Sequence, residues 1–390
     1  MKTFRLLALA SCFAAFLVTG ACGDDDATVR PRLDAGAIDS GVTSDADVGA
    51  LACGAVVPTK YESPGFAANA AVQLALAARF EEIEQKMRST EVPDAGVVVT
   101  AAELKAIYNA GSPSLRAVST TPAQSVVDAY FDAFEAALGK SWTPDDADQD
   151  GGAATGGKYG DWHFSPIGVD LREAAAKTLL QGAFYNHVVG IVARQLTEAD
   201  VDSLLAAFGA MTALASPAGA DAGGEGDKLI AEYASKRDDK QSATPGPYRN
   251  VMTALLKMKA AIPAGDRCKG DLQLAVNTFL AEWEKAVFGT AIYYLNSAAT
   301  KIIAVQKPES LHAYGEALGF IQSFKGVPAE RRKITDVQID QLLEKIGATT
   351  PWKLVTGAGD RALQLNAAVS DIALYQGFTA AEVEAFKKSF

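Results

Sequence analysis

The chain has 390 residues, and its 47 acidic side chains outnumber its 36 basic ones, which gives a formal net charge of −11. A protein this acidic repels the phosphate backbone of nucleic acids, and no basic cluster in the sequence offsets that repulsion. Nucleic acid is therefore not an expected partner.

Residues 1–21 have the anatomy of an export signal. Lys2 and Arg5 give it a positive start, and the apolar run 6–18 is shorter than the roughly 20 residues that a membrane-spanning helix needs. The run ends in "TGAC", which is typical of a bacterial lipoprotein cleavage site with Cys22 as the lipidated residue. We expect an exported protein anchored by lipid in the bacterial cell envelope, at an outer membrane and facing the periplasm or the cell surface. Plain secretion with a free Cys22 is the alternative.

The sequence of residues 22–54 predicts a disordered acidic tether. The stretch 23–50 contains seven aspartates and no aromatic residue, so it cannot bury enough apolar surface to offset the entropy of ordering it. Such a tether would hold the folded body away from the membrane surface.

Two of the four cysteines belong to the folded body. Cys12 leaves with the signal and Cys22 takes the lipid, which leaves Cys53 and Cys268 in an oxidising compartment. We predict a disulfide between them, with two unpaired thiols as the alternative, because spacing alone gives no geometry.

The sequence of the folded body predicts an all-α fold. From about residue 61 alanine and leucine are abundant, and apolar residues recur at steps of three and four. The clearest helical segments are residues 66–88, 123–139, 168–195 and 270–304.

A loop-rich connection at residues 216–248 divides the body into a helical half at 55–215 and another at 249–390. We expect two bundle-like halves, or one large bundle with a long crossover.

The stretch "DADQDG", residues 146–151, has the spacing that begins a calcium loop, with Asp146, Asp148 and Asp150 as ligands. Position twelve of that loop is Gly157, where the motif requires a bidentate glutamate. A solvated acidic loop is the favoured alternative.

His187 lies on a helical stripe with Leu180 and Phe184, which favours a hydrogen-bonded core histidine over a metal ligand. Glu173 falls on the same face but about 21 Å away along the axis. We therefore expect no shared site for these two residues.

His312 and Glu316 are the candidate metal ligands. At positions i and i+4 of a helix they face the same way, so they can offer one nitrogen and one carboxylate to an ion. Gly315 and Gly319 lie at or on that face and would let another backbone come close, so we expect a buried face. The alternative is an ordinary solvated face, and a tight site needs at least one further donor.

The sequence contains none of the common enzyme signatures, which favours a function without catalysis. It identifies no protein partner.

Three stretches carry a resemblance to a known family: "GVDLREAAAKTLLQGAFYNHVVG", "YYLNSAATKI" and "LHAYGEALGFI". They resemble secreted all-helical bacterial lipoproteins without assigned function, which in turn resemble the imelysin-like, iron-regulated surface proteins. Imelysin-like proteins carry Gly-x-His-x-x-Glu, implicated in metal binding. Here Ser310 replaces the glycine, and the glutamate is Glu316, one position later, with Gly315 in its place.

Three functions follow as hypotheses. The resemblance implies an envelope binding module for a metal or metal complex in iron acquisition, with an iron or zinc ion as cofactor. The second hypothesis is a structural or protein-interaction lipoprotein with no small-molecule site. The third, a metal-dependent hydrolase, is implied because some imelysins were classed as metallopeptidases.

Overall fold

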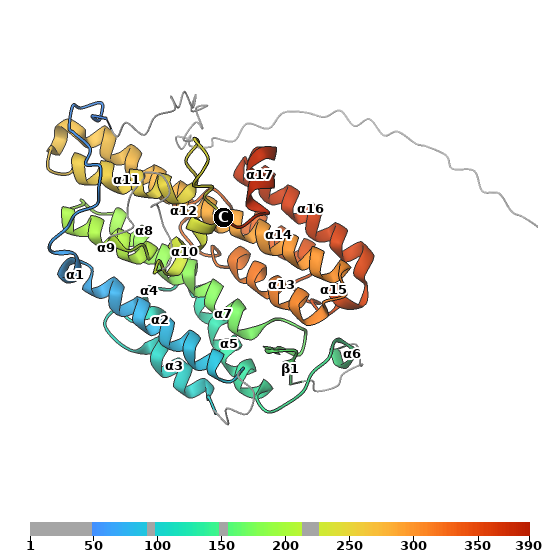
Figure 1. Cartoon of the computed structure of the whole chain (residues 1–390). Coiled ribbons are helices and arrows are strands. Elements are labelled where there is room, and N and C mark those ends of the chain that lie inside the picture. The colour runs from blue at the N-terminus through green and yellow to red at the C-terminus, as the bar shows by residue number, and fades with distance from the viewer. Residues whose placement is uncertain (1–48, 92–97, 148–154, 213–225) are drawn as a thin grey trace, which may run out of the picture. The chain divides into compact units, whose positions relative to one another are not determined.

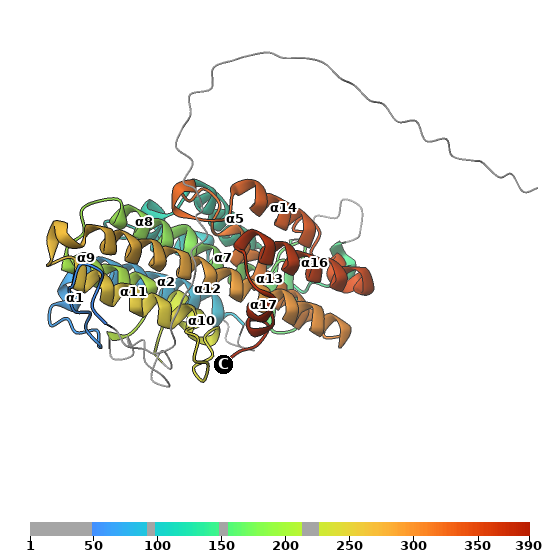
Figure 2. The ribbon, with the colours of Figure 1, turned by 90° about the horizontal axis from the view of Figure 1, so that it is seen from above.

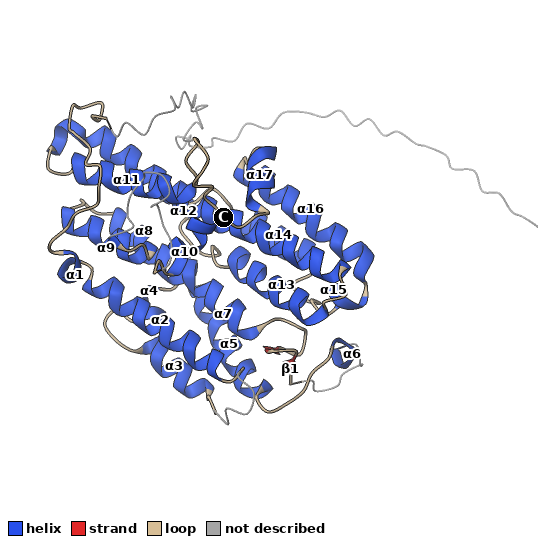
Figure 3. Cartoon of the chain, viewed as in Figure 1, coloured by secondary structure: helices blue, strands red, loops and turns tan. Residues whose placement is uncertain are grey.

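The computed structural model describes residues 49–91, 98–147, 155–212 and 226–390 (Figure 1). Helices make up nearly all the regular structure in these ranges, as Figure 3 shows, so the predicted all-α class is confirmed. A small antiparallel hairpin joins strands β1 (Gly157–Tyr159) and β2 (Trp162–Phe164).

The helices before the 216–248 connection are α1 (Phe66–Asn69), α2 (Ala71–Ser89), α3 (Ala101–Asn109), α4 (Leu115–Val118), α5 (Thr121–Ala137), α6 (Pro144–Ala147), α7 (Leu171–Leu179), α8 (Asn186–Val192) and α9 (Glu198–Phe208). Several begin at a side chain that accepts a backbone N–H of the first turn, among them Thr100, Thr120, Asp170 and Thr197.

The later helices are α10 (Leu229–Lys236), α11 (Pro247–Ala261), α12 (Lys269–Ile303), α13 (Lys307–Gln322), α14 (Asp336–Ile346), α15 (Lys353–Thr356), α16 (Ala358–Gln376) and α17 (Ala380–Phe386). Short 3-10 turns lie at Gly265–Cys268 and Ala329–Arg331. The four clearest segments of the sequence pattern correspond to α1 with α2, to α5, to α7 with α8, and to α12.

Helix α12 is the longest helix and has neighbours along its whole length. It packs against α11, α13 and α16, and Figure 2 shows it running beside α11. Its apolar stripe is buried from Val276 to Ile302. Since burying apolar surface is the main favourable term in folding, this stripe accounts for the central place of α12.

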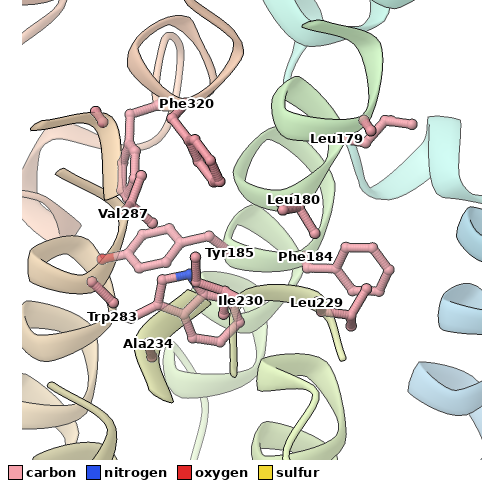
Figure 4. Close-up of a cluster of buried hydrophobic side chains, with 14 of the residues drawn as sticks. Leu179, Leu180, Phe184, Tyr185, Leu229, Ile230, Ala234, Trp283, Val287 and Phe320 are labelled. Atoms are coloured by element: carbon pink, nitrogen blue, oxygen red, sulfur yellow. The ribbon is translucent and has the colours of Figure 1, made fainter. Parts of the chain in front are cut away.

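One hydrophobic core contains residues from both predicted halves. In Figure 4, Tyr185 and Phe184 lie close to Ile230 of α10 and to Trp283 of α12. The ring centroids of Tyr185 and Trp283 are 5.5 Å apart at an interplanar angle of 77°. Of the two arrangements left open by the sequence, this shared core fits the single large bundle.

A π-helical segment, Leu180–Tyr185, joins α7 to α8. Its wider i→i+5 winding changes the direction in which the following side chains point. The carbonyl of Gly182 in this segment accepts the backbone N–H of Thr120 at 2.8 Å. The segment therefore also holds the beginning of α5.

The predicted disulfide between Cys53 and Cys268 is present, with Cα atoms 5.2 Å apart. Beside it, the carboxylate of Asp271 accepts the backbone N–H groups of Ala52 and Cys53 at 3.3 Å and 3.0 Å. Leu51 is buried as well. Residues 49–54, assigned from the sequence to the end of the tether, thus lie against the start of α12.

The predicted signal, Cys22 and the tether up to residue 48 lie outside the described residues. Among the helices that are described, none combines the length and the apolarity needed to cross a membrane.

Candidate metal centre

Helices α7 and α13 lie unusually close together because two glycines of α13 face α7. A Cβ atom at Gly315 would lie 2.8 Å from the Cβ of Asp170, and one at Gly319 would lie 2.6 Å from the Cβ of Lys177. Any larger residue at these positions would push the helices apart. The expectation that these glycines admit another backbone is therefore confirmed, and the neighbour is α7.

Two carboxylates and one imidazole meet between these helices. Glu173 of α7 and His312 and Glu316 of α13 each offer a donor atom, and the three atoms lie within 4.8 Å of one another. The side chains of Glu173, Glu316 and His312 are 5%, 9% and 18% exposed. Helix α7 thus supplies the further donor that the pair on α13 requires.

His312 is oriented by Asp170, the N-cap residue of α7. One oxygen of this fully buried carboxylate accepts the backbone N–H of Glu173 at 3.1 Å, and the other lies 2.8 Å from His312 Nδ1. We assign the proton of the neutral imidazole to Nδ1, because Asp170 can only accept a hydrogen bond there. The lone pair of Nε2 is then free, and Nε2 lies 3.4 Å from Glu316 Oε1.

Trp162 of the β1–β2 hairpin covers one face of the imidazole. The two ring centroids are 4.4 Å apart and the planes meet at 17°. The hairpin rests on the start of α13, where Gly160 lies so close to Pro308 that a Cβ would be 2.8 Å away. Stacking and the Asp170 hydrogen bond together fix the ring in one orientation.

The side chains of Lys177 and Arg172 pair with the carboxylates of this cluster. Lys177 Nζ lies 2.6 Å from Glu173 Oε2 and 4.0 Å from Glu316 Oε2. Arg172 Nη1 lies 2.5 Å from the other oxygen of Glu173, and its Nε donates to Glu91 at 2.8 Å. Glu316 Oε2 has no hydrogen-bond partner although it is buried.

The electrostatics of the two glutamates differ. Burial, together with the negative charge of Glu173, raises the pKa of Glu316 to about 7. Burial would also raise the pKa of Glu173, but the charges of Lys177 and Arg172 outweigh it and lower that pKa to about 2. Glu173 therefore stays ionised near neutral pH, whereas Glu316 takes up a proton as the pH falls through about 7.

The pKa of His312 is raised above its usual range. Burial acts to lower it, but the hydrogen bond to Asp170 and the charges of Asp170, Glu173 and Glu316 outweigh that effect. With a neutral imidazole, the carboxylates of Asp170, Glu173, Glu316 and Glu91 outnumber the two cations, Lys177 and Arg172, so the group carries excess negative charge. Either a proton or a metal ion can offset this buried negative charge.

The other predicted site residues lie elsewhere. The Nε2 atom of His187 is 3.0 Å from Nε2 of Gln73 on α2, and burial together with the charge of Arg194 lowers its pKa. Asp146 accepts the N–H and the hydroxyl of Thr143, at 2.6 Å and 3.0 Å. Asp148 and Asp150 lie outside the described residues, so the calcium loop stays a prediction.

Sequence reasoning connected Glu173 only with His187 and did not connect it with His312. The π-helical segment between Glu173 and His187 turns His187 toward α2, while Glu173 faces α13. The pattern "DLRE" does indicate a helix start with Asp170 as its N-cap and Glu173 in the first turn. Nothing in the sequence pairs that turn with α13.

Comparisons of the chain with family models, with curated proteins and with solved structures gave no match.

Proposed function

We propose that this protein is an exported lipoprotein of the cell envelope that binds a divalent metal ion through Glu173, His312 and Glu316. The observation that supports the proposal most is Glu173, because a third donor from a second helix lies within reach of the His312 and Glu316 pair. A solvated helix face would have offered no such donor.

The chemistry of the donors suits iron or zinc. One imidazole nitrogen and two carboxylate oxygens are ligands that both Zn²⁺ and Fe²⁺ accept. Asp170 would act as the outer-shell partner that keeps His312 in the tautomer with a free Nε2. Glu173 needs no deprotonation near neutral pH, since its pKa is about 2.

The proposal is tested by metal analysis of protein purified without added metal, followed by titration with Zn²⁺ and Fe²⁺ against a competing chelator. We expect about one ion per chain. Protein that carries no metal and takes none up would contradict the proposal and favour the interaction lipoprotein. Amide-bond hydrolysis by the metal-loaded protein would favour the hydrolase.

Metal affinity is expected to fall steeply as the pH drops below about 7. The ion binds the deprotonated forms of His312 and Glu316, and both groups have raised pKa values, that of Glu316 being about 7. Protons therefore compete with the ion at and below that pH, and affinity reaches its plateau only where both groups are deprotonated. Chelator-competition titrations between pH 5.5 and 8.5 measure this dependence, and a flat profile would speak against these ligands.

Replacing Cys22 with serine is expected to release the protein from the membrane fraction. In the proposed lipoprotein signal, the lipid is attached to the cysteine that follows the small residues 19–21. Fractionation of cells expressing each form measures the distribution. Serine at Cys12, which belongs to the removed signal, is the matched control and should leave the protein in the membrane fraction. Equal distribution of the Cys22→Ser variant and the parent would contradict the anchor.

A further inference from the structure

Lys177 occupies the space between two of the three proposed ligands. It lies one helical turn after Glu173, and its side chain is 5% exposed. Its ammonium is 2.6 Å from Glu173 Oε2 and 4.0 Å from Glu316 Oε2. The same two carboxylates would have to coordinate the metal ion.

A bound divalent ion and this ammonium would repel each other strongly. A metal ion lies about 2.0–2.2 Å from a carboxylate oxygen that binds it. An ion on Glu173 Oε2 would thus lie less than about 5 Å from the ammonium in its present position, in a site that water does not screen. The two cations cannot occupy their positions together at low cost.

A carboxylate outside the proposed ligands attracts the ammonium from α2. Lys177 and Glu84 of α2 attract each other electrostatically. The Lys177 ammonium also lies over the ring of Tyr233, 5.2 Å from its centroid, and an aromatic face of this kind attracts cations.

We propose that Lys177 is a built-in competitor of the metal ion, bridging Glu173 and Glu316 in the metal-free protein and moving toward Glu84 when an ion binds. This inference rests on the proposed function. It adds that the centre can release its ion: the ammonium returns to Glu173 as the ion leaves, so Glu173 is not left as an uncompensated buried charge. A module that captures a metal and passes it on needs such an exchangeable site.

The test compares Zn²⁺ affinity of the wild type and Lys177→Gln by chelator competition at one pH and salt concentration. Removing the ammonium should tighten binding at least tenfold, or about 1.4 kcal/mol. Lys177→Arg keeps the charge and should not tighten it. Lys285→Gln is the matched control, because Lys285 pairs with Glu382 and with none of the ligands.

A second variant covers the case in which Lys177→Gln does not fold. Glu84→Gln keeps Lys177 but removes the carboxylate that would receive its ammonium, so Zn²⁺ binding should weaken severalfold. If the glutamine at 177 folds, combining both changes should make the Glu84 effect much smaller, since no ammonium remains to be displaced.

The results separate the two proposals. Wild type that binds Zn²⁺ while Lys177→Gln binds equally or more weakly overturns the competitor and leaves the metal centre standing. Binding by Lys177→Gln but not by the wild type supports the competitor and overturns the proposed function. Binding by neither overturns both. If Lys177→Gln does not fold, unchanged affinity in Glu84→Gln overturns the competitor.

Discussion

Replacing His312 with alanine is expected to lower metal affinity at least tenfold, about 1.4 kcal/mol. The change removes the one nitrogen donor of the centre and leaves two carboxylates beside Lys177, which then pairs with them without competition. Titration with Zn²⁺ against a chelator measures the loss. Glu173→Gln should give a loss of similar size, because it removes the donor that α7 contributes.

His187→Ala is the matched control for this experiment. His187 is also a partly buried histidine, but its partner is Gln73 and it belongs to no group of metal-binding side chains among the described residues. Its loss should leave metal affinity unchanged. Equal affinities for wild type and His312→Ala would show that the cluster is an ion-pair network and not a metal centre.

Replacing Cys53 with serine is expected to lower the free energy of unfolding by about 2–5 kcal/mol. The disulfide closes a loop of 215 residues, and opening it gives the denatured chain much more conformational freedom. The native state keeps part of the contact, since Asp271 still accepts the N–H groups of residues 52 and 53. Urea unfolding of both forms measures the difference.

Reduction of the wild type supplies the control for this variant. A dithiol reductant should lower the stability of the wild type to that of Cys53→Ser and should leave the variant unchanged. A difference below about 0.5 kcal/mol between the oxidised wild type and the variant, the range of ordinary surface changes, would contradict the prediction.

The all-α class and the shared face of His312 and Glu316 on α13 could be predicted because both depend on local periodicity. A spacing of four residues places His312 and Glu316 on one side of any α-helix. The glycines at 315 and 319 further indicated that another backbone approaches this side. These signals are contained in a few turns of one helix.

Which backbone approaches could not be predicted, because the partner lies far away in the sequence. Glu173 and His312 are separated by more than a hundred residues, and only the packing of α7 against α13 brings them together. Helical periodicity does not indicate Trp162 either, because this residue contacts His312 from a short hairpin inside a glycine-rich stretch. Helical periodicity also assumes one winding, which the π-helical segment after α7 interrupts.

The π winding of Leu180–Tyr185 decides which way Glu173 faces relative to α8. An uninterrupted α-helix would need one residue fewer between α7 and α8. The same number of residues wound as an ordinary α-helix would rotate α7 against α8 by about 100°. With α8 held in the core, Glu173 and Lys177 would then turn away from α13. The approach of Glu173 to His312 therefore depends on this turn keeping its wide winding, and a substitution there that favours α winding would separate the two side chains without changing either residue.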